Sequence, residues 1–197
     1  SEVGNTMDIV VSNIIQVLDE MGIQSAVFMG VSLGTIFIKY MEMKYESYID
    51  KAILVGALGA VGKPLRRAVN VFARIGDKLP FPIVYRIMAK LFMPWKVSRT
   101  SRKVFCKCAK ALNSVEFKAY MNIFIEHFSF CDEFVSVSHE ENIYISGRGD
   151  LCFINGIVEE SDLTDATLII IEHCGHVCNI DQGRQFNEII SEVLSIE

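Results

Sequence analysis

Residues 26–34 read AVFMGVSLG, and this stretch decides the fold. Its first four residues are a continuous apolar run, which is typical of a strand buried on both faces. The next five, Gly30 to Gly34, fit the pattern G-x-S-x-G, in which a strand turns sharply into a helix. Such a turn needs small residues at positions 30 and 34, and it lifts the hydroxyl of Ser32 clear of the sheet. The sequence therefore predicts a strand, then a serine at its carboxyl end, then a helix over residues 33–45.

Helices and strands alternate on both sides of this turn. Before it, residues 6–21 carry apolar side chains at helical spacing, and Gly22 stands where a glycine commonly ends a helix. After it come three apolar runs and a closing amphipathic helix: residues 51–55, 142–146, 166–171 and 182–194. This alternation predicts the α/β class, with a mostly parallel sheet and flanking helices.

The middle of the chain, residues 63–138, interrupts this alternation. It has no convincing strand, and prolines break its helical stretches. We therefore expect three parts: residues 1–62 as the first part of the core, residues 63–138 as a helical cap, and residues 139–197 as the second part of the core.

The cap segment also concentrates the positive charge. Residues 63–118 of this segment hold 14 of the 19 Lys and Arg residues but only two acidic residues, which gives them a net charge of about +12 within a chain of net charge −5. One interpretation is a solvated surface. The other is a face that recognises an anionic substrate or an anionic membrane, because apolar residues are interleaved with Arg86, Lys90 and Lys96 as in an interfacial helix.

Composition limits the class of protein. Hydrophobic residues make up 51% of the 197 residues, yet charges or glycines break every apolar run before the roughly 20 residues that span a bilayer. The first residues show no secretory signal. We expect a cytoplasmic domain with reduced cysteines, no cofactor and no nucleic-acid partner. The spacing of His173, Cys174, His176 and Cys178 fits no usual zinc pattern, so we expect no metal.

Three residues at the ends of expected strands could carry chemistry. The hydroxyl of Ser32 is a weak nucleophile and needs a base. His176 follows the last strand, where an open α/β sheet gathers its active groups, and Asp150 follows the strand before it. A carboxylate there would orient the imidazole and stabilise its charged form. The alternative is that Ser32 only caps a helix, and that the other two are ordinary turn residues.

The remaining histidines fit the role of base less well. His127 falls within the cap segment and His139 at its exit, while His173 lies directly on the strand end beside His176.

Two motifs carry a resemblance to a known family, namely residues 27–34 and residues 175–180 with the amphipathic helix that follows. With them the sequence resembles the α/β-hydrolase superfamily, in particular its capped esterase and C–C-hydrolase-like branch, over residues 6–56 and 142–194. The resemblance implies a cap over an active site with these roles: Ser32 as nucleophile, Asp150 as acid, His176 as base, and the backbone N–H of Leu33 as an oxyanion donor.

The resemblance has one gap. In the family several strands precede the helix that leads into the serine turn, and a loop after one of them supplies a second oxyanion N–H. This sequence starts at that helix, so we expect an N-terminally truncated form of the fold. Loss of one oxyanion donor typically lowers the rate by about 10²–10³, so we expect weak activity. We also expect strand 26–29 to expose an edge that pairs with a second copy or with the missing N-terminal segment.

The leading hypothesis is therefore a hydrolase of ester, thioester or similar acyl bonds that works through a Ser-His-Asp triad and an acyl-enzyme. Its substrate would be a small apolar acyl compound, because the cap segment is rich in Phe, Met, Ile and Leu. Two alternatives remain: a truncated or non-catalytic binding module, and a C–C hydrolase or lyase that uses the same triad.

Overall fold

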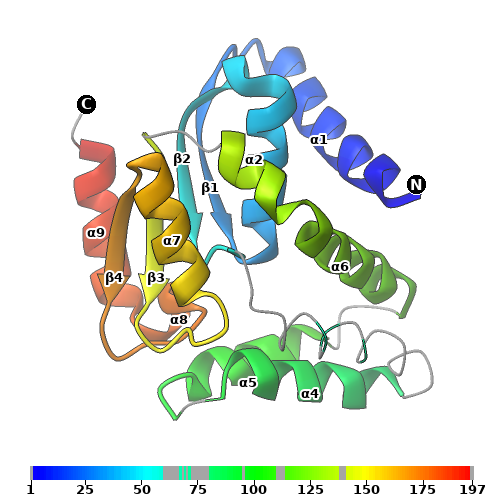
Figure 1. Cartoon of the computed structure of the whole chain (residues 1–197), viewed down its shortest axis with the longest axis vertical. Helices are drawn as coiled ribbons and strands as arrows, with labels where there is room; N and C mark the ends of the chain where they lie inside the picture. The colour runs from blue at the N-terminus through cyan, green and yellow to red at the C-terminus, as the bar shows by residue number, and fades with distance from the viewer. Residues whose placement is uncertain are drawn as a thin grey trace.

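A four-stranded parallel sheet forms the centre of the computed structural model, which describes residues 2–59, 67, 69, 71, 80–94, 96–109, 114–137 and 141–195 (Figure 1). The strands lie side by side in chain order: β1 (Ala26–Val31), β2 (Ile49–Val55), β3 (Ile143–Gly147) and β4 (Thr167–Ile171). Each neighbouring pair is parallel. The expected α/β class with a parallel sheet is thus confirmed.

Helices cover both faces of the sheet. Successive side chains of a strand point to opposite faces, so each strand contributes apolar side chains to a core on either side. In β2, Ala52 and Leu54 pack on one core cluster and Ile53 and Val55 on the other. The first cluster lies under α1 (Glu2–Met21), α2 (Leu33–Tyr45), α6 (Ser114–Val137) and α7 (Ile154–Thr164). The second lies under α8 (Cys178–Asp181) and α9 (Gly183–Ser195). The two central strands, β2 and β3, are consequently buried on both faces over most of their length, as their continuous apolar runs predict.

The expected strands and the closing helix are present within about two residues of their predicted ends, as is usual for element boundaries. The first helix starts earlier than its apolar spacing indicates, at Glu2, and ends where expected: Gly22 has φ 69°. Three elements were not predicted: the helix α7, the one-turn helix α8 and the short 3-10 helix η1 (Glu46–Tyr48).

All the regular secondary structure that the structure describes in the middle segment is helical. It contains α4 (Phe81–Phe92), α5 (Arg99–Cys108) and α6, and no strand occurs among its described residues. In Figure 1, α4 and α5 lie across the carboxyl ends of the strands, while α6 extends from them to the side of α2. This position places the segment over the edge of the sheet where Ser32 lies.

The strand β1 lies at one edge of the described sheet. It pairs with β2 alone among the residues that the structure describes, and the side chain of Met29 is 53% exposed. An edge strand presents backbone N–H and C=O groups that another chain can pair with. Its association with a second copy or an N-terminal segment stays a prediction.

In the described parts of the chain, no helix combines the length and the apolar character needed to span a bilayer.

Candidate active site

The serine turn is held in a backbone conformation that side chains rarely adopt. Ser32 lies between the end of β1 and the start of α2, with φ 52° and ψ −114°. Such a conformation costs on the order of 1–3 kcal/mol and persists only where its surroundings fix it. Here the Ser32 N–H donates to the carbonyl of Val55 at 2.9 Å, and the hydroxyl of Thr35 donates to the Ser32 carbonyl at 2.7 Å. The turn is therefore fixed from both sides.

The two glycines of this turn play different parts. A Cβ on Gly30 would lie 2.7 Å from the backbone carbon of Gly34, closer than real Cβ atoms approach. A Cβ on Gly34 would meet no atom within 4 Å. We expected both positions to lack space for a side chain, but only Gly30 does. At Gly34 it is the backbone that faces the strand, and a Cβ would point away from it.

The structure brings Ser32, His176 and Asp150 together at the carboxyl end of the sheet. The Oγ of Ser32 lies 2.8 Å from Nε2 of His176, and Nδ1 of His176 lies 2.7 Å from Oδ2 of Asp150. His176 and Asp150 are almost completely buried, at 5% and 0% exposed. The carboxylate therefore accepts a hydrogen bond from Nδ1–H, which leaves Nε2 free to accept the hydroxyl proton of the serine.

The backbone of His176 passes close to Gly56, the residue after β2. Gly56 has φ 52°, and a Cβ on it would lie 2.4 Å from the carbonyl oxygen of His176. Both the conformation and the space require glycine here. The pattern of residues 51–56 showed the strand end but not this contact.

We predict that Gly56→Ala displaces the His176 loop. A misplacement of about 1 Å in an active site can lower the rate 10²-fold, so kcat/KM should fall by about that factor. The matched control is Gly183→Ala, because a Cβ at that position meets nothing within 4 Å. Initial rates with an ester substrate measure both variants. Equal rates for the Gly56 variant and the wild type would contradict the role of this contact.

Neither of the other two histidines that the structure describes contacts Ser32. His173 is exposed in a left-handed turn with φ 58°. His127 is buried in α6, where its Nε2–H donates to the carbonyl of Leu58. His139 lies outside the described residues.

Burial lowers the pKa of His127 to about 4 from its ordinary 6.5. The unfolded chain therefore binds a proton between these values that the folded chain does not, so the free energy of unfolding falls as the pH falls from 6.5 to 4. We predict a loss of about 3 kcal/mol from this residue across that range. His127→Gln, which keeps an N–H donor, should show a smaller loss in urea unfolding at pH 7 and pH 4.5; an unchanged loss would contradict the assignment.

An apolar cavity of about 320 Å³ opens beside Ser32 and His176. The sheet side contributes Val31, Leu33, Leu58, Phe153 and Val177. The helices α4, α5 and α6, with the C-cap residue Met93 of α4, contribute Tyr85, Met88, Phe92, Met93, Phe105, Phe117, Tyr120, Met121 and Phe124. The ring centroid of Phe153 lies 5.1 Å from that of the His176 imidazole, and the ring centroid of Phe92 lies 6.4 Å from it. The cavity thus offers space for apolar groups next to the serine hydroxyl. Phe153 was not identified from the sequence, because nothing in its pattern distinguishes it from a core residue.

Asp181 joins α5 to the segment that carries His176. Its two carboxylate oxygens accept hydrogen bonds from the backbone N–H of Ser101 at 3.1 Å and from the Ser101 hydroxyl at 3.0 Å. The side chain of Ser98, at the N-cap position of α5, makes no capping hydrogen bond. Asp181 therefore does what an N-cap residue does, although it comes from α8. No sequence signal reveals such a partner 80 residues away.

We predict that Asp181→Ala destabilises the chain by about 1–2 kcal/mol, the usual value of an N-cap. Because Phe105 of α5 lines the cavity, KM for an apolar ester should rise more than kcat falls. Thermal unfolding and steady-state kinetics test this, with Asp162→Ala on the exposed side of α7 as the control. Equal effects of the two substitutions would show that Asp181 does not hold α5.

Leu33 is the first residue of α2, so its backbone N–H is one of those at a helix start that lack a partner within the helix. Its use as an oxyanion donor stays a prediction. Among the described residues, no group of three His, Cys, Asp or Glu side chains is placed to hold a metal ion.

No family model and no curated protein matches this sequence, but solved structures do. An enol-lactonase from Burkholderia xenovorans matches with a TM-score of 0.76 and 14% identity, over 96% of this chain and 73% of that one. An esterase from Exiguobacterium antarcticum matches with 0.72 and 15%, over 93% and 72%. A meta-cleavage product hydrolase from Pseudomonas fluorescens matches with 0.67 and 20%, over 96% and 71%. At these identities the matches show the fold alone, which is that of the α/β-hydrolases.

Proposed function

We propose that this chain, which has the α/β-hydrolase fold, hydrolyses an ester, thioester or similar acyl bond with Ser32 as nucleophile, His176 as base and Asp150 as acid. The observation that carries the proposal is the pair of contacts through His176, 2.8 Å to Ser32 and 2.7 Å to Asp150, in a buried site. The strained φ of Ser32 supports it, because such strain concentrates at functional sites.

The reaction follows from this geometry. His176 takes the hydroxyl proton at Nε2 while the serine oxygen attacks the acyl carbon, and Asp150 stabilises the imidazolium through Nδ1–H. The start of α2 behind Ser32 favours the negative charge that develops on the acyl oxygen. His176 then gives its proton to the leaving group, which departs and leaves an acyl-enzyme. A water molecule, deprotonated by the same nitrogen, releases the acid.

The cavity supports an apolar acyl substrate. Apart from Ser32 and His176, its lining consists of aliphatic and aromatic side chains and methionines, with hydroxyl groups only on Tyr85 and Tyr120. A charged acyl group would lose its hydration there without finding an ion-pair partner. Among straight-chain esters we expect kcat/KM to rise with acyl length until the cavity is full.

Covalent labelling tests the proposal directly. A fluorophosphonate probe should modify the purified chain at Ser32, as located by peptide mass spectrometry, and a panel of p-nitrophenyl esters should be hydrolysed. Modification of Ser32 without ester turnover would favour another reaction of the same triad, such as C–C hydrolysis. Absence of modification would leave the binding module as the better hypothesis.

A further inference from the structure

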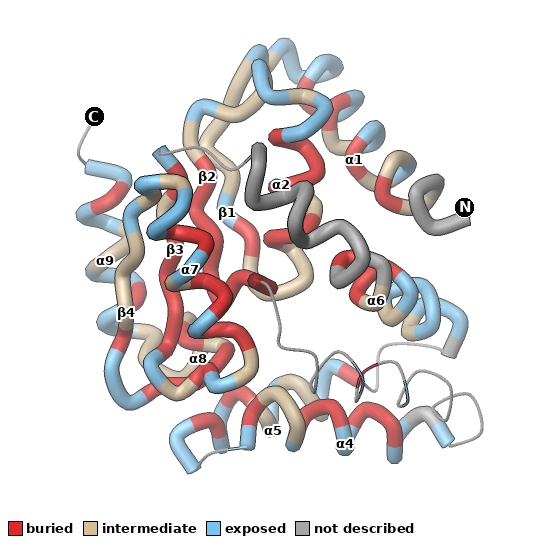
Figure 2. Tube along the Cα trace, viewed as in Figure 1, coloured by how far each residue is buried: buried red, intermediate tan, exposed pale blue. Residues whose placement is uncertain are grey.

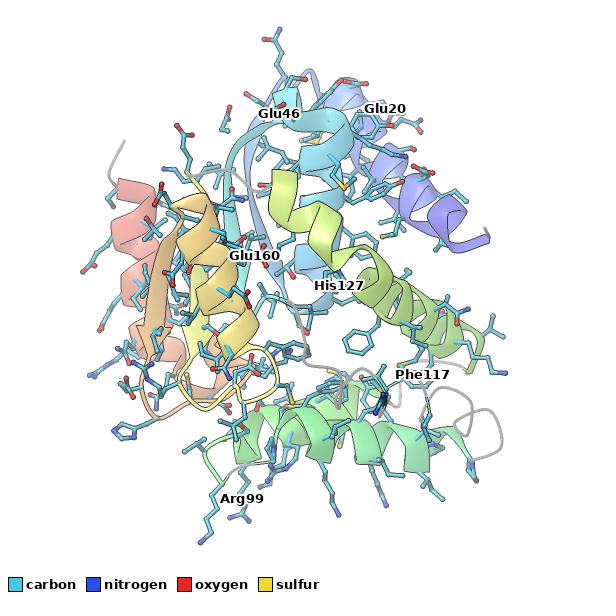
Figure 3. All side chains as sticks on the ribbon, viewed as in Figure 1. Glu20, Glu46, Arg99, Phe117, His127 and Glu160 are labelled. Carbon is cyan, nitrogen blue, oxygen red and sulfur yellow. The ribbon has the colours of Figure 1, made fainter. Side chains whose placement is uncertain are left out.

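The outer surfaces of α4 and α5 form a continuous basic face. Six exposed basic residues lie on it: Arg86, Lys90, Lys96, Arg99, Lys103 and Lys107. The sequence from Lys78 to Val115 contains no acidic residue, so no neighbour along the chain neutralises this charge. Exposed and buried residues alternate along both helices in Figure 2, and Arg99 extends away from the body of the molecule in Figure 3.

Large apolar side chains lie among these charges. Ile83, Ile87, Val97 and Val104 are 37–46% exposed, and all four belong to α4, to α5 or to the turn between them. A solvated basic surface does not require them. A surface with basic residues around exposed apolar side chains is instead typical of helices that lie at a membrane interface.

A groove of about 270 Å³ runs between the two helices within the basic face. Five basic residues line it, namely Arg86, Lys90, Arg99, Arg102 and Lys103, with Ala89 and Cys106. The surface of the groove is mostly apolar, and the basic residues around it carry the charge that a phosphate group on this face would meet.

The opposite side of the same helices lines the apolar cavity. In α4, Tyr85 and Met88 are buried and contact the cavity, while Arg86, Ile87 and Lys90 are exposed. One helical layer therefore separates the basic face from Ser32.

We propose that the basic face binds the surface of a bilayer that contains anionic phospholipids. The cations contact headgroup phosphates, and Ile83, Ile87, Val97 and Val104 enter the interface. An apolar acyl compound dissolved in the bilayer would then lie one helical layer away from the cavity. The proposal rests on the basic face alone and does not depend on hydrolysis by Ser32.

The test is co-sedimentation of the full chain with vesicles of phosphatidylglycerol and phosphatidylcholine in equal parts, and with pure phosphatidylcholine. Binding is expected to the first only and should fall with salt, because screening shortens the range of exposed charges. Each basic residue near an anionic surface strengthens binding about fivefold, so Arg86→Glu/Lys90→Glu/Lys103→Glu should weaken it at least about 100-fold. The control Lys44→Glu/Lys51→Glu/Arg184→Glu changes the net charge equally but lies outside α4 and α5, and should weaken binding far less.

A second variant, Ile83→Ser/Ile87→Ser/Val104→Ser, separates a lipid surface from a nucleic-acid surface. It keeps every charge and should weaken vesicle binding about tenfold, because apolar insertion is lost. Circular dichroism establishes that each variant is folded. No vesicle binding at low salt, or equal losses in the charge variant and its control, would overturn the proposal. The proposal would also be overturned if the Ile83→Ser/Ile87→Ser/Val104→Ser variant bound vesicles like the wild type and the wild-type chain bound single-stranded RNA.

Discussion

Ser32→Ala is expected to lower kcat for p-nitrophenyl ester hydrolysis by about 10⁴–10⁶-fold, since the covalent route disappears with the nucleophile. Alanine fits the turn as well as serine does, because the φ of 52° is imposed by the hydrogen bonds around it. The thermal midpoint should therefore change little. The release of p-nitrophenol measures the rate. The Ser32→Ala variant should also no longer be labelled by the fluorophosphonate probe.

Non-additivity sharpens this test. If Ser32 and His176 act as one unit across the 2.8 Å contact, His176→Ala should lose about as much activity, and the double variant should be no worse than either single one. Ser191→Ala, an exposed serine on α9, is the control and should keep full activity. Activity that survives Ser32→Ala would contradict the assignment of Ser32 as nucleophile. If the two losses in rate multiplied in the double variant, the two side chains would act independently.

The parts of the site that the sequence predicts are those in which local structure determines position. Ser32, Asp150 and His176 each follow a strand, and parallel strands bring their carboxyl ends to one edge, so the expected placement needs only the alternation of elements. The need for glycine at position 30 can be predicted in the same way, because the turn itself brings the backbone of Gly30 against that of Gly34. Gly34 shows the limit of the pattern, since the motif does not tell which glycine is crowded.

The contacts made between distant segments could not be predicted. Asp181 caps a helix that begins 80 residues earlier, and Phe153 packs on an imidazole that comes from another loop. Both depend on how α5 and α7 are placed on the sheet, and neither helix has a local signal for that placement. The helix α7 itself was not expected, because Asp162 and its acidic neighbours obscure the apolar spacing that its buried side supplies.

A buried ion pair fixes one of these placements. Nζ of Lys39 on α2 donates to Oε1 of Glu160 on α7, and the hydroxyl of Tyr144 on β3 donates to the same oxygen at 2.8 Å. The two charged side chains are 1% and 2% exposed, and Glu160 is labelled in Figure 3. Because α2 starts beside Ser32 and α7 follows the loop of Asp150, this pair joins the two helices whose starts flank the site.

Removing one partner of this pair is expected to lower the free energy of unfolding more than replacing both partners together. Lys39→Met leaves the carboxylate of Glu160 buried without its counter-ion, and we expect the free energy of unfolding to fall by about 3–5 kcal/mol. Glu160→Gln alone should cost a similar amount, because it leaves the ammonium of Lys39 buried. In Lys39→Met/Glu160→Gln no charge is buried and the amide oxygen still accepts from Tyr144, so the double variant should lose much less than the sum of the two single losses.

Urea unfolding of the three variants measures this coupling. The control is Lys44→Met on the same helix, where Lys44 pairs with Asp8 at side-chain exposures of 42% and 45%. An exposed pair is worth about 0–1 kcal/mol, so this variant should unfold close to the wild type. Losses that simply add in the Lys39/Glu160 double variant would show that the two charges do not support each other. In that case the packing of α7 on α2, and not the ion pair, would have to set the distance between the Ser32 turn and the Asp150 loop.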